Sequence, residues 1–317
     1  MSLDLNLNSG HGSKSIDPVV RNIRQRKLID FLFAMAGLLS LLFALVTLLA
    51  LVIDLAVTGV PRLSTEFFLN FPSRFPEKAG ILSAWVGSIC VMLTTAFCAI
   101  PLGVAAGVYL EEYAPKNWMT QLIELNIINL AGIPSITFGL MALGIFVYKL
   151  GFGQSILTAG LTLGLLVLPI IIVTTRESVR AIPSTIREAS YAVGASKWQT
   201  IRYHILPYSF GGILTGMIIS LSRAIGETAP LITIGALTFV AFLPTAPVHP
   251  DFPFLSFQWL KDPFTVLPIQ MFNWLSRPQS EFHVNAAATG IVLLLMTLVL
   301  NGVAIYTRYR FRKKMKW

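Results

Sequence analysis

Six long apolar stretches, separated by polar segments, constrain the fold of this chain more than any other feature of its sequence. Each stretch is long enough to cross the hydrocarbon core of a bilayer, which takes about 20 helical residues. Of the 317 residues only 12% are charged, against about 25% in soluble domains. The sequence therefore predicts an all-α fold, a polytopic membrane helix bundle with six transmembrane helices. The expected spans are 28–53, 81–110, 121–148, 155–175, 208–240 and 286–306.

The distribution of lysine and arginine sets the expected orientation. These residues concentrate before residue 28, between Arg176 and Arg202, and after Tyr306, three segments that fall on one side of a six-span topology. The positive-inside rule places that side, with both termini, in the cytoplasm. The short EEYAPKN segment from Glu111 is acidic and does not follow the rule. The expected divisions are a cytoplasmic tail (1–27), a transmembrane domain (28–309) and a basic cytoplasmic tail (310–317).

The net charge of +9 could indicate nucleic-acid binding, but the basic residues lie beside apolar spans, where they meet anionic lipid headgroups. We therefore expect contact with the lipid bilayer and no nucleic-acid partner. The chain contains no Gly-Lys pair, which excludes a P-loop, so ATP hydrolysis would have to come from a partner. No metal site, cofactor site or catalytic nucleophile–base arrangement is apparent. Cys90 and Cys98 lie about 12 Å apart by helical rise, too far for a disulfide.

Proline divides the spans into two kinds. Spans two to five contain Pro101, Pro134, Pro169 and Pro230, while the first and last contain none. A proline inside a membrane helix removes a backbone hydrogen bond, which neighbouring helices or cavity water must replace. We therefore expect spans two to five to form the core of a pathway and spans one and six to pack outside it. The alternative is that proline is simply common in membrane helices.

Polar side chains within these spans are candidates for a translocation pathway. Arg223 and Glu227 lie four residues apart in the fifth span, so they share a helix face and can form an ion pair. Two roles stay open: Arg223 lowers the barrier for an anion while Glu227 orients it, or the pair locks two helices together. Ser135 and Thr137, beside Pro134, would offer hydroxyls and freed backbone groups, or would pack between helices.

The external segment 241–285 is rich in proline and aromatic residues. Within it, residues 264–283 predict an interfacial segment with one apolar face. Such a segment would either rest on lipid headgroups or contact an external partner. The residues able to share that face are Phe264, Leu267, Met271 and Trp274.

The cytoplasmic segment 181–207 is expected to project beyond the membrane. Pro183 favours a helix start, and Thr185 and Glu188 have the spacing of a capping box. Gly194 should end that helix, because glycine adopts the left-handed conformation without steric cost. The first half of the segment therefore predicts a short, separate helix.

A second short helix is expected to run from about Ser196 to Pro207. Two short helices joined at a glycine would form a compact knob. The side chains of Tyr191, Val193 and Trp198 are more apolar than a solvated loop requires, which indicates a protein interface.

Six residues of the knob form a pattern: Glu188, Ala189, Ser190, Gly194, Leu206 and Pro207. The pattern resembles the EAA–x3–G signature of ABC importer permeases. In that family the loop is the coupling helix, which sits in a groove of the ATPase subunit and passes its motion to the membrane helices. Ser190 stands where the family often has alanine, and His204 stands at an aliphatic position.

Four further segments narrow the resemblance: ILSAWVGSICVMLTTAFCAIPLGVAAGVYLEEYA, GIPSITFGL, SRAIGETAPL and LPIQMFNWLSRPQ. Together they are similar to phosphate-specific importer permeases of the PstA type, although related oxyanion importers remain an alternative. The resemblance implies a type I ABC importer permease fold in the bacterial cytoplasmic (inner) membrane. It also implies three partners: an ABC ATPase dimer, a second permease subunit of the PstC type and an external phosphate-binding protein.

Two other classes of protein stay open on the sequence alone. A secondary transporter would favour internal repeats and paired interrupted helices, and no repeat is detectable. A membrane scaffold would use the knob only to recruit a partner. Uptake into vesicles separates the classes, because it would be driven by ATP, driven by an ion gradient, or absent.

Overall fold

The computed structural model describes residues 16–246 and 256–314, and every regular element within these ranges is helical. The chain divides into two compact units, residues 1–54 and 55–317, which are described separately. Parts of three predicted segments lie outside the described residues, namely 1–15, 247–255 and 315–317.

The first unit contains most of one long helix. α1 begins at Ile16 and ends at Gly59. Its stretch Arg26–Arg62 is long and apolar enough to cross a membrane. The first predicted span, 28–53, is therefore confirmed as helical.

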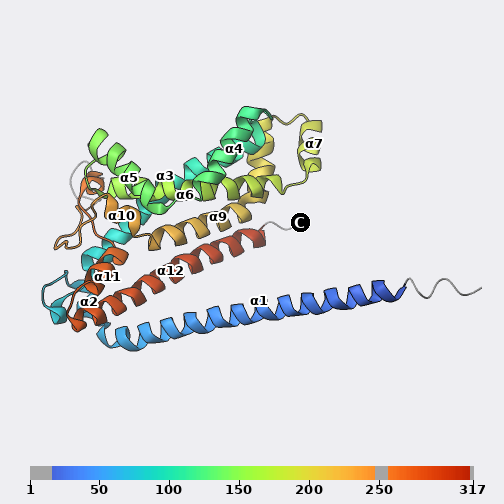
Figure 1. Cartoon of the computed structure of the whole chain (residues 1–317). Helices are drawn as coiled ribbons and strands as arrows, with labels where there is room; N and C mark the ends of the chain where they lie inside the picture. The colour runs from blue at the N-terminus through green and yellow to red at the C-terminus, as the bar shows by residue number, and fades with distance from the viewer. Residues whose placement is uncertain (1–15, 247–255, 315–317) are drawn as a thin grey trace, which may run out of the picture. The chain divides into compact units, whose positions relative to one another are not determined.

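Four long helices frame the second unit. They are α3 (Leu82–Val108), α6 (Ile156–Arg180), α9 (Leu206–Gly226) and α12 (Ser280–Lys314). α6 packs against both α3 and α9, and α12 packs against α9 (Figure 1). The buried side chains where these helices meet include Val91, Leu163, Ile171, Ala224 and Ile225.

The close crossing of α3 and α6 depends on glycine. A Cβ atom at Gly103 would lie only 2.6 Å from Cγ2 of Ile171. Small residues allow membrane helices to approach in this way, because packing replaces the hydrophobic driving force that lipid does not supply. The two cysteines of α3, Cys90 and Cys98, are both free, as their spacing predicted.

The third predicted span is not one helix. α4 (Trp118–Leu130) and α5 (Ser135–Ala142), which continues as a π-helical stretch, are bent by 104° relative to each other. Gly132 and Pro134 lie in the break, where proline removes a donor and restricts the preceding residue to extended backbone. Within the described ranges there are therefore five candidate spans, or six if the bent pair counts as one.

The fifth predicted span is displaced toward the N-terminus. α9 ends at Gly226 rather than near residue 240, and Pro230 lies in the first turn of the short helix α10 (Ala229–Thr233). A proline in a first helical turn is favourable because its missing N–H would have no partner there. The sequence between Gly226 and residue 240 is apolar, but it does not continue the span.

The predicted helix end at Pro207 is also wrong. α8 (Lys197–Thr200) continues through the π-helical turn Ile201–Ile205 directly into α9. The N–H of Leu206 reaches the carbonyl of Ile201, and Pro207 follows in the first turn of α9. The wider turn places the proline where its missing N–H is tolerated.

Two short helices, α2 (Thr65–Leu69) and α11 (Leu267–Leu275), lie at the end of the second unit opposite α7 (Ser184–Ala192), as Figure 1 shows. Trp274 of α11 is fully buried, with ring centroids 6.1 Å from Phe67 and 6.5 Å from Phe282. The predicted apolar face of this segment therefore packs mainly against protein, while Phe272 and Leu275 of α11 are exposed. The aromatic side chains that cover its apolar face come partly from a distant part of the sequence.

Candidate functional site

The segment between α6 and α9 forms the predicted knob, with different capping from that expected. Pro183 is the N-cap residue of α7 and makes no side-chain cap. The predicted capping box of Thr185 and Glu188 is wrong, because proline has no side-chain acceptor at the N-cap position. The capping box lies instead at the start of α8, where Ser196 and Gln199 exchange hydrogen bonds of 3.3 and 2.8 Å.

Gly194 separates α7 from α8, as predicted. Its φ angle of +84° lies in the left-handed region, which residues with a Cβ atom rarely adopt. The hydroxyls of Ser190 and Thr200, both buried, lie 2.8 Å apart and join the two helices across this turn. Ser190 thus gives the knob a hydrogen bond that alanine at this position could not form.

The outer face of the knob is apolar and exposed, as predicted. Val193 is 85% exposed, Trp198 56% and Tyr191 43%. Single exposed apolar residues are ordinary, but a group of them on a projecting knob indicates a surface that another protein covers. Of the pattern residues, Leu206 is half-buried and Ser190 is buried. The exposed ones are Glu188, Ala189, Gly194 and Pro207.

An apolar cluster lies beneath the knob. It joins the end of α3, the last turn of α6 and the π-helical turn before α9, and Ile186 of α7 packs against it. Burying one such side chain contributes about 1.5–3 kcal/mol to the stability of the fold, relative to leaving it exposed. The knob is therefore seated on the ends of two long helices. The cluster consists of Val108, Val179, Ile182, Ile201 and Ile205.

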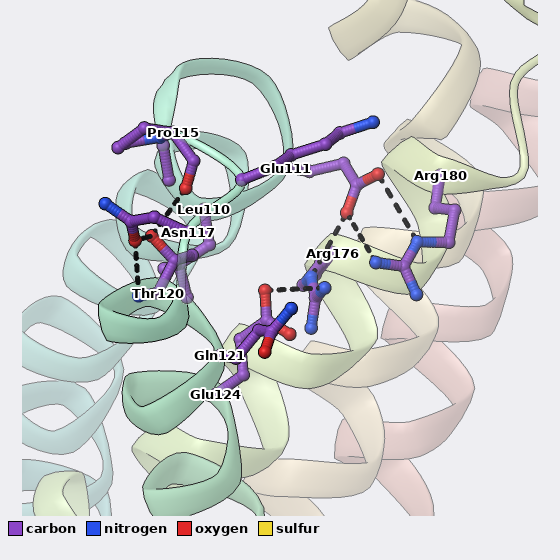
Figure 2. Close-up of a pocket in the computed structure, with 11 residues that line it drawn as sticks. Leu110, Glu111, Pro115, Asn117, Thr120, Gln121, Glu124, Arg176 and Arg180 are labelled. Atoms are coloured by element: carbon purple, nitrogen blue, oxygen red, sulfur yellow. Dashed lines mark hydrogen bonds and ion pairs between the residues drawn. The ribbon is translucent and has the colours of Figure 1, made fainter.

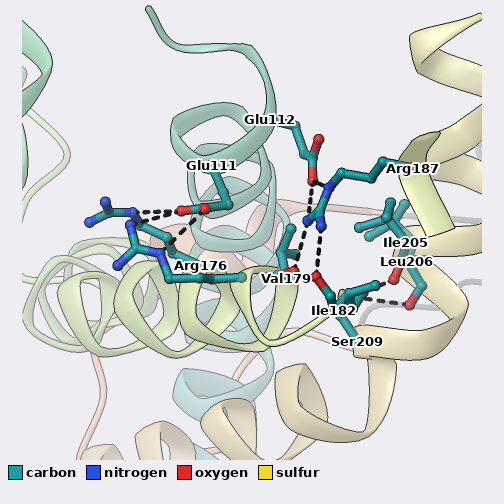
Figure 3. Close-up of polar contacts among 10 residues, drawn as sticks. Glu111, Glu112, Arg176, Val179, Ile182, Arg187, Ile205, Leu206 and Ser209 are labelled. Atoms are coloured by element: carbon teal, nitrogen blue, oxygen red, sulfur yellow. Dashed lines mark hydrogen bonds and ion pairs between the residues drawn. The ribbon is translucent and has the colours of Figure 1, made fainter. Parts of the chain in front are cut away.

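Two adjacent acidic residues lie where α3 ends, in a π-helical turn. Glu112 accepts hydrogen bonds on Oε1 from Nε (2.9 Å) and Nη2 (2.7 Å) of Arg187 in α7 (Figure 3). The guanidinium of Arg187 also donates to the carbonyls of Ile182 (2.7 Å) and Val179 (3.0 Å). One arginine thus connects α7, the end of α3 and the end of α6.

Glu111 makes ion pairs with α6 instead. Its carboxylate lies 3.1 Å from Nε of Arg176 and 3.1 Å from Nη2 of Arg180. Arg176 also lies 2.7 Å from Glu124 of α4, at the edge of a pocket of about 290 Å³ (Figure 2). The position of Arg176 and Arg180 after an apolar span suggested that they anchor the helix in the lipid headgroups. The structure shows that both are also paired with acidic side chains of this chain.

Three members of the site were not predicted from the sequence, namely Glu111, Glu112 and Arg187. The sequence did contain one indication of them: the EEYAPKN segment is acidic, although it follows a span on the cytoplasmic side, where basic residues are expected. Such a segment implies basic partners, because partly buried carboxylates need compensation. The sequence does not indicate which arginines supply it, since the pairs join residues far apart in the chain.

The predicted ion pair between Arg223 and Glu227 is present, with 3.2 Å between Nε and Oε1. Glu227 is the first residue beyond the last turn of α9 and has extended backbone. Arg223 is exposed and Glu227 is half-buried, so the pair lies at the surface of this chain.

The second predicted pathway group lies at the start of α5. The hydroxyl of Thr137 donates to the carbonyl of Pro134 (2.7 Å), and Ser135 is the first helical residue. α5 packs on α10, where a Cβ atom at Gly139 would lie 2.7 Å from Cα of Pro230. The two groups therefore belong to neighbouring parts of the fold, although no hydrogen bond joins them within the described ranges.

The sequence of residues 99–317 matches the family model of the binding-protein-dependent transport system inner membrane component. The phosphate transport system permease protein PstA of Yersinia pestis is 33% identical over 92% of this chain and 92% of its own length. The probable ABC transporter permease protein YqgI of Bacillus subtilis is 31% identical, covering 82% of this chain and 88% of its own.

A chain of the MetNI methionine ABC transporter, solved in inward-facing conformations, has a similar structure. The TM-score is 0.52 at 17% identity, covering 73% of this chain and 94% of that one. At this identity the similarity concerns the fold alone.

Proposed function

Because the chain belongs to the family of binding-protein-dependent transport system inner membrane components, the permease subunits of ABC importers, we propose that it imports inorganic phosphate. Family membership implies an ATPase partner and a substrate-binding protein, and it gives no support to a secondary transporter. The observation that carries the phosphate assignment is the 33% identity to PstA of Yersinia pestis over 298 residues.

The proposed partners rest on the resemblance of this chain to permeases of the PstA type. They are an ATPase dimer, a second permease subunit of the PstC type and an external phosphate-binding protein. The ATPase would dock on the apolar outer face of the knob, beside the exposed carboxylate of Glu188. Both termini and the knob would lie in the cytoplasm of a bacterial cell. The proposed coupling residues are Glu188, Ala189, Ser190, Gly194, Leu206 and Pro207.

The proposed pathway uses Arg223 as the cationic group that lowers the barrier for an anion. Glu227 accepts a hydrogen bond from Nε of Arg223, which orients the guanidinium while leaving its other donors available. Ser135, Thr137 and the break at Pro134 would supply weak polar contacts. Weak contacts suit a permease, because an anion held tightly would not leave.

Uptake by the reconstituted complex tests this proposal. The chain is placed in liposomes with its ATPase, second permease and phosphate-binding protein, and radioactive phosphate is added outside with ATP inside. We expect uptake that requires ATP and is not reduced by an equal concentration of sulfate. Stronger uptake of another oxyanion would assign the chain to a related importer. Uptake driven by an ion gradient without ATP would contradict the proposal.

A further inference from the structure

We infer that the ion pair of Glu112 and Arg187 is the strut through which a displacement of the knob reaches α3. This inference rests on the proposed function, since it concerns how an ATPase docked on the knob would act on the membrane helices. Both residues are proposed as positioning residues, which act by holding α7 against the end of α3.

The burial of the pair distinguishes it from an ordinary surface ion pair. The side chain of Glu112 is 6% exposed and that of Arg187 is 19% exposed. Exposed pairs contribute little to stability, whereas removing one partner of a buried pair is strongly destabilising because the other charge is left without compensation. The contact therefore resists separation when α7 is displaced.

The geometry of Arg187 makes the contact stiff as well as strong. Nε and Nη2 both donate to one carboxylate oxygen of Glu112, while Nη1 and Nη2 donate to the carbonyls of Ile182 and Val179 (Figure 3). A planar guanidinium held by an acidic side chain and two backbone carbonyls has little freedom to rotate. Lysine at this position would keep the charge but not this set of directions.

Two neighbouring residues of α7 lie on different sides of the helix. Arg187 is half-buried and reaches α3, while the next residue, Glu188, is exposed. A short helix with one face available to a partner and the other fixed to α3 is suited to move with the partner and to pull on the helix behind it.

The ion pairs continue beyond α3. Glu111, adjacent to Glu112, binds Arg176 of α6, and Arg176 binds Glu124 of α4 (Figure 2). α4 leads to the break before α5, where the proposed pathway residue Pro134 lies. A contiguous set of charged contacts therefore runs from α7 through α3 and α6 to α4. The coupling carried by these contacts can be measured directly with variants of the pair.

The first test measures phosphate imported per ATP hydrolysed, a ratio that does not depend on how much complex is folded. The variants are Glu112→Gln, Arg187→Met, Arg187→Lys and the double variant Glu112→Gln/Arg187→Met. Arg310→Met, at an exposed arginine near the end of α12, is the matched control for losing one positive charge.

We expect each of the Glu112→Gln and Arg187→Met substitutions to lower the ratio at least about fivefold, the lower end of typical coupling between sites. The double variant should fall no further than the single ones, because the two residues act as one contact. Arg187→Lys should be intermediate and Arg310→Met unchanged. Unaltered ratios in the single variants, or a double variant equal to the product of the single effects, would overturn the strut.

A second test does not depend on the transported anion. Spin labels are placed at the exposed residues Thr185 of α7 and Leu102 of α3, in a chain with Cys90 and Cys98 replaced by alanine. In the complete complex, the distance distribution should stay narrow with and without ATP and vanadate. Glu112→Gln/Arg187→Met, which leaves no unpaired charge, should broaden it. An unchanged distribution in that variant would overturn the strut, whereas failure of the unaltered complex to import phosphate would reject only the proposed function.

Discussion

At the scale of single residues, Arg176 lies between two carboxylates, those of Glu111 and Glu124, and its side chain is 16% exposed. Replacing it by methionine leaves Glu124 without a cationic partner and leaves Glu111 paired with Arg180 alone. We expect Arg176→Met to lower the free energy of unfolding by about 2–4 kcal/mol, slightly less than a fully buried pair would lose. Thermal unfolding of the chain in detergent measures the change.

Arg180→Met is the matched control, because Arg180 binds the same Glu111 but is 49% exposed. Its loss should lower the free energy of unfolding by no more than about 1 kcal/mol, as for surface ion pairs generally. Equal losses in the two variants would show that burial does not set the strength of these pairs.

Arg223 gives the residue-scale prediction for the pathway. We expect Arg223→Gln to reduce phosphate uptake at least about tenfold while the complex assembles normally, because the barrier for an anion rises without the cation. Arg74→Gln replaces an exposed arginine that is distant from Arg223 in the sequence, and it should change neither phosphate uptake nor assembly of the complex. Normal uptake by Arg223→Gln would leave the pair with Glu227 as a structural contact only.

Individual contacts were predictable from the sequence only where they are local. The pair of Arg223 and Glu227 follows from a spacing of four residues. The pair of Glu112 and Arg187 joins residues 75 positions apart, and helical spacing contains no information about it. The buried hydroxyl contact of Ser190 likewise depends on how α7 folds back on α8.

At the scale of elements, the turn between α7 and α8 depends on one backbone conformation. Gly194→Ala places a Cβ atom at a φ angle of +84° and should destabilise the turn by about 1–2 kcal/mol. We expect less ATPase to co-purify with this variant. Gly211→Ala, inside α9 with no atom near the added Cβ, should instead be neutral or stabilising by about 0.5–1 kcal/mol. Equal recovery of ATPase with both variants would contradict the proposed importance of the turn.

Hydropathy predicted where helices cross a bilayer better than where they bend. The spans that became α3, α6 and α12 were found near their observed positions, because length and apolar composition determine a span. The 104° bend between α4 and α5 was not predicted, since an apolar stretch with one proline is compatible with a straight span. α11 was misassigned for a related reason: an apolar face looks the same whether protein or lipid covers it.

At the scale of the whole molecule, the topology predicts which segments each side of the membrane can reach. A membrane-impermeant maleimide added outside intact cells should label Arg74→Cys but not Val193→Cys, in a chain without its native cysteines. Both positions are exposed in the isolated chain. Because the proposed ATPase would cover Val193 in the cell, labelling of Val193→Cys in the purified chain is the control for reactivity. Labelling of Val193→Cys from outside would reverse the orientation that the lysine and arginine distribution predicts.

The knob is proposed to be the surface on which an ATPase docks to drive transport. The most direct measurement is the amount of ATPase that co-purifies with the variant Val193→Asp/Trp198→Asp, whose positions are 85% and 56% exposed and do not contribute to the core. We predict that the second permease subunit remains bound, which reports a folded chain, while the ATPase is lost. Deleting residues 185–198 should have the same effect on the ATPase. Full recovery of the ATPase with either variant would contradict the account.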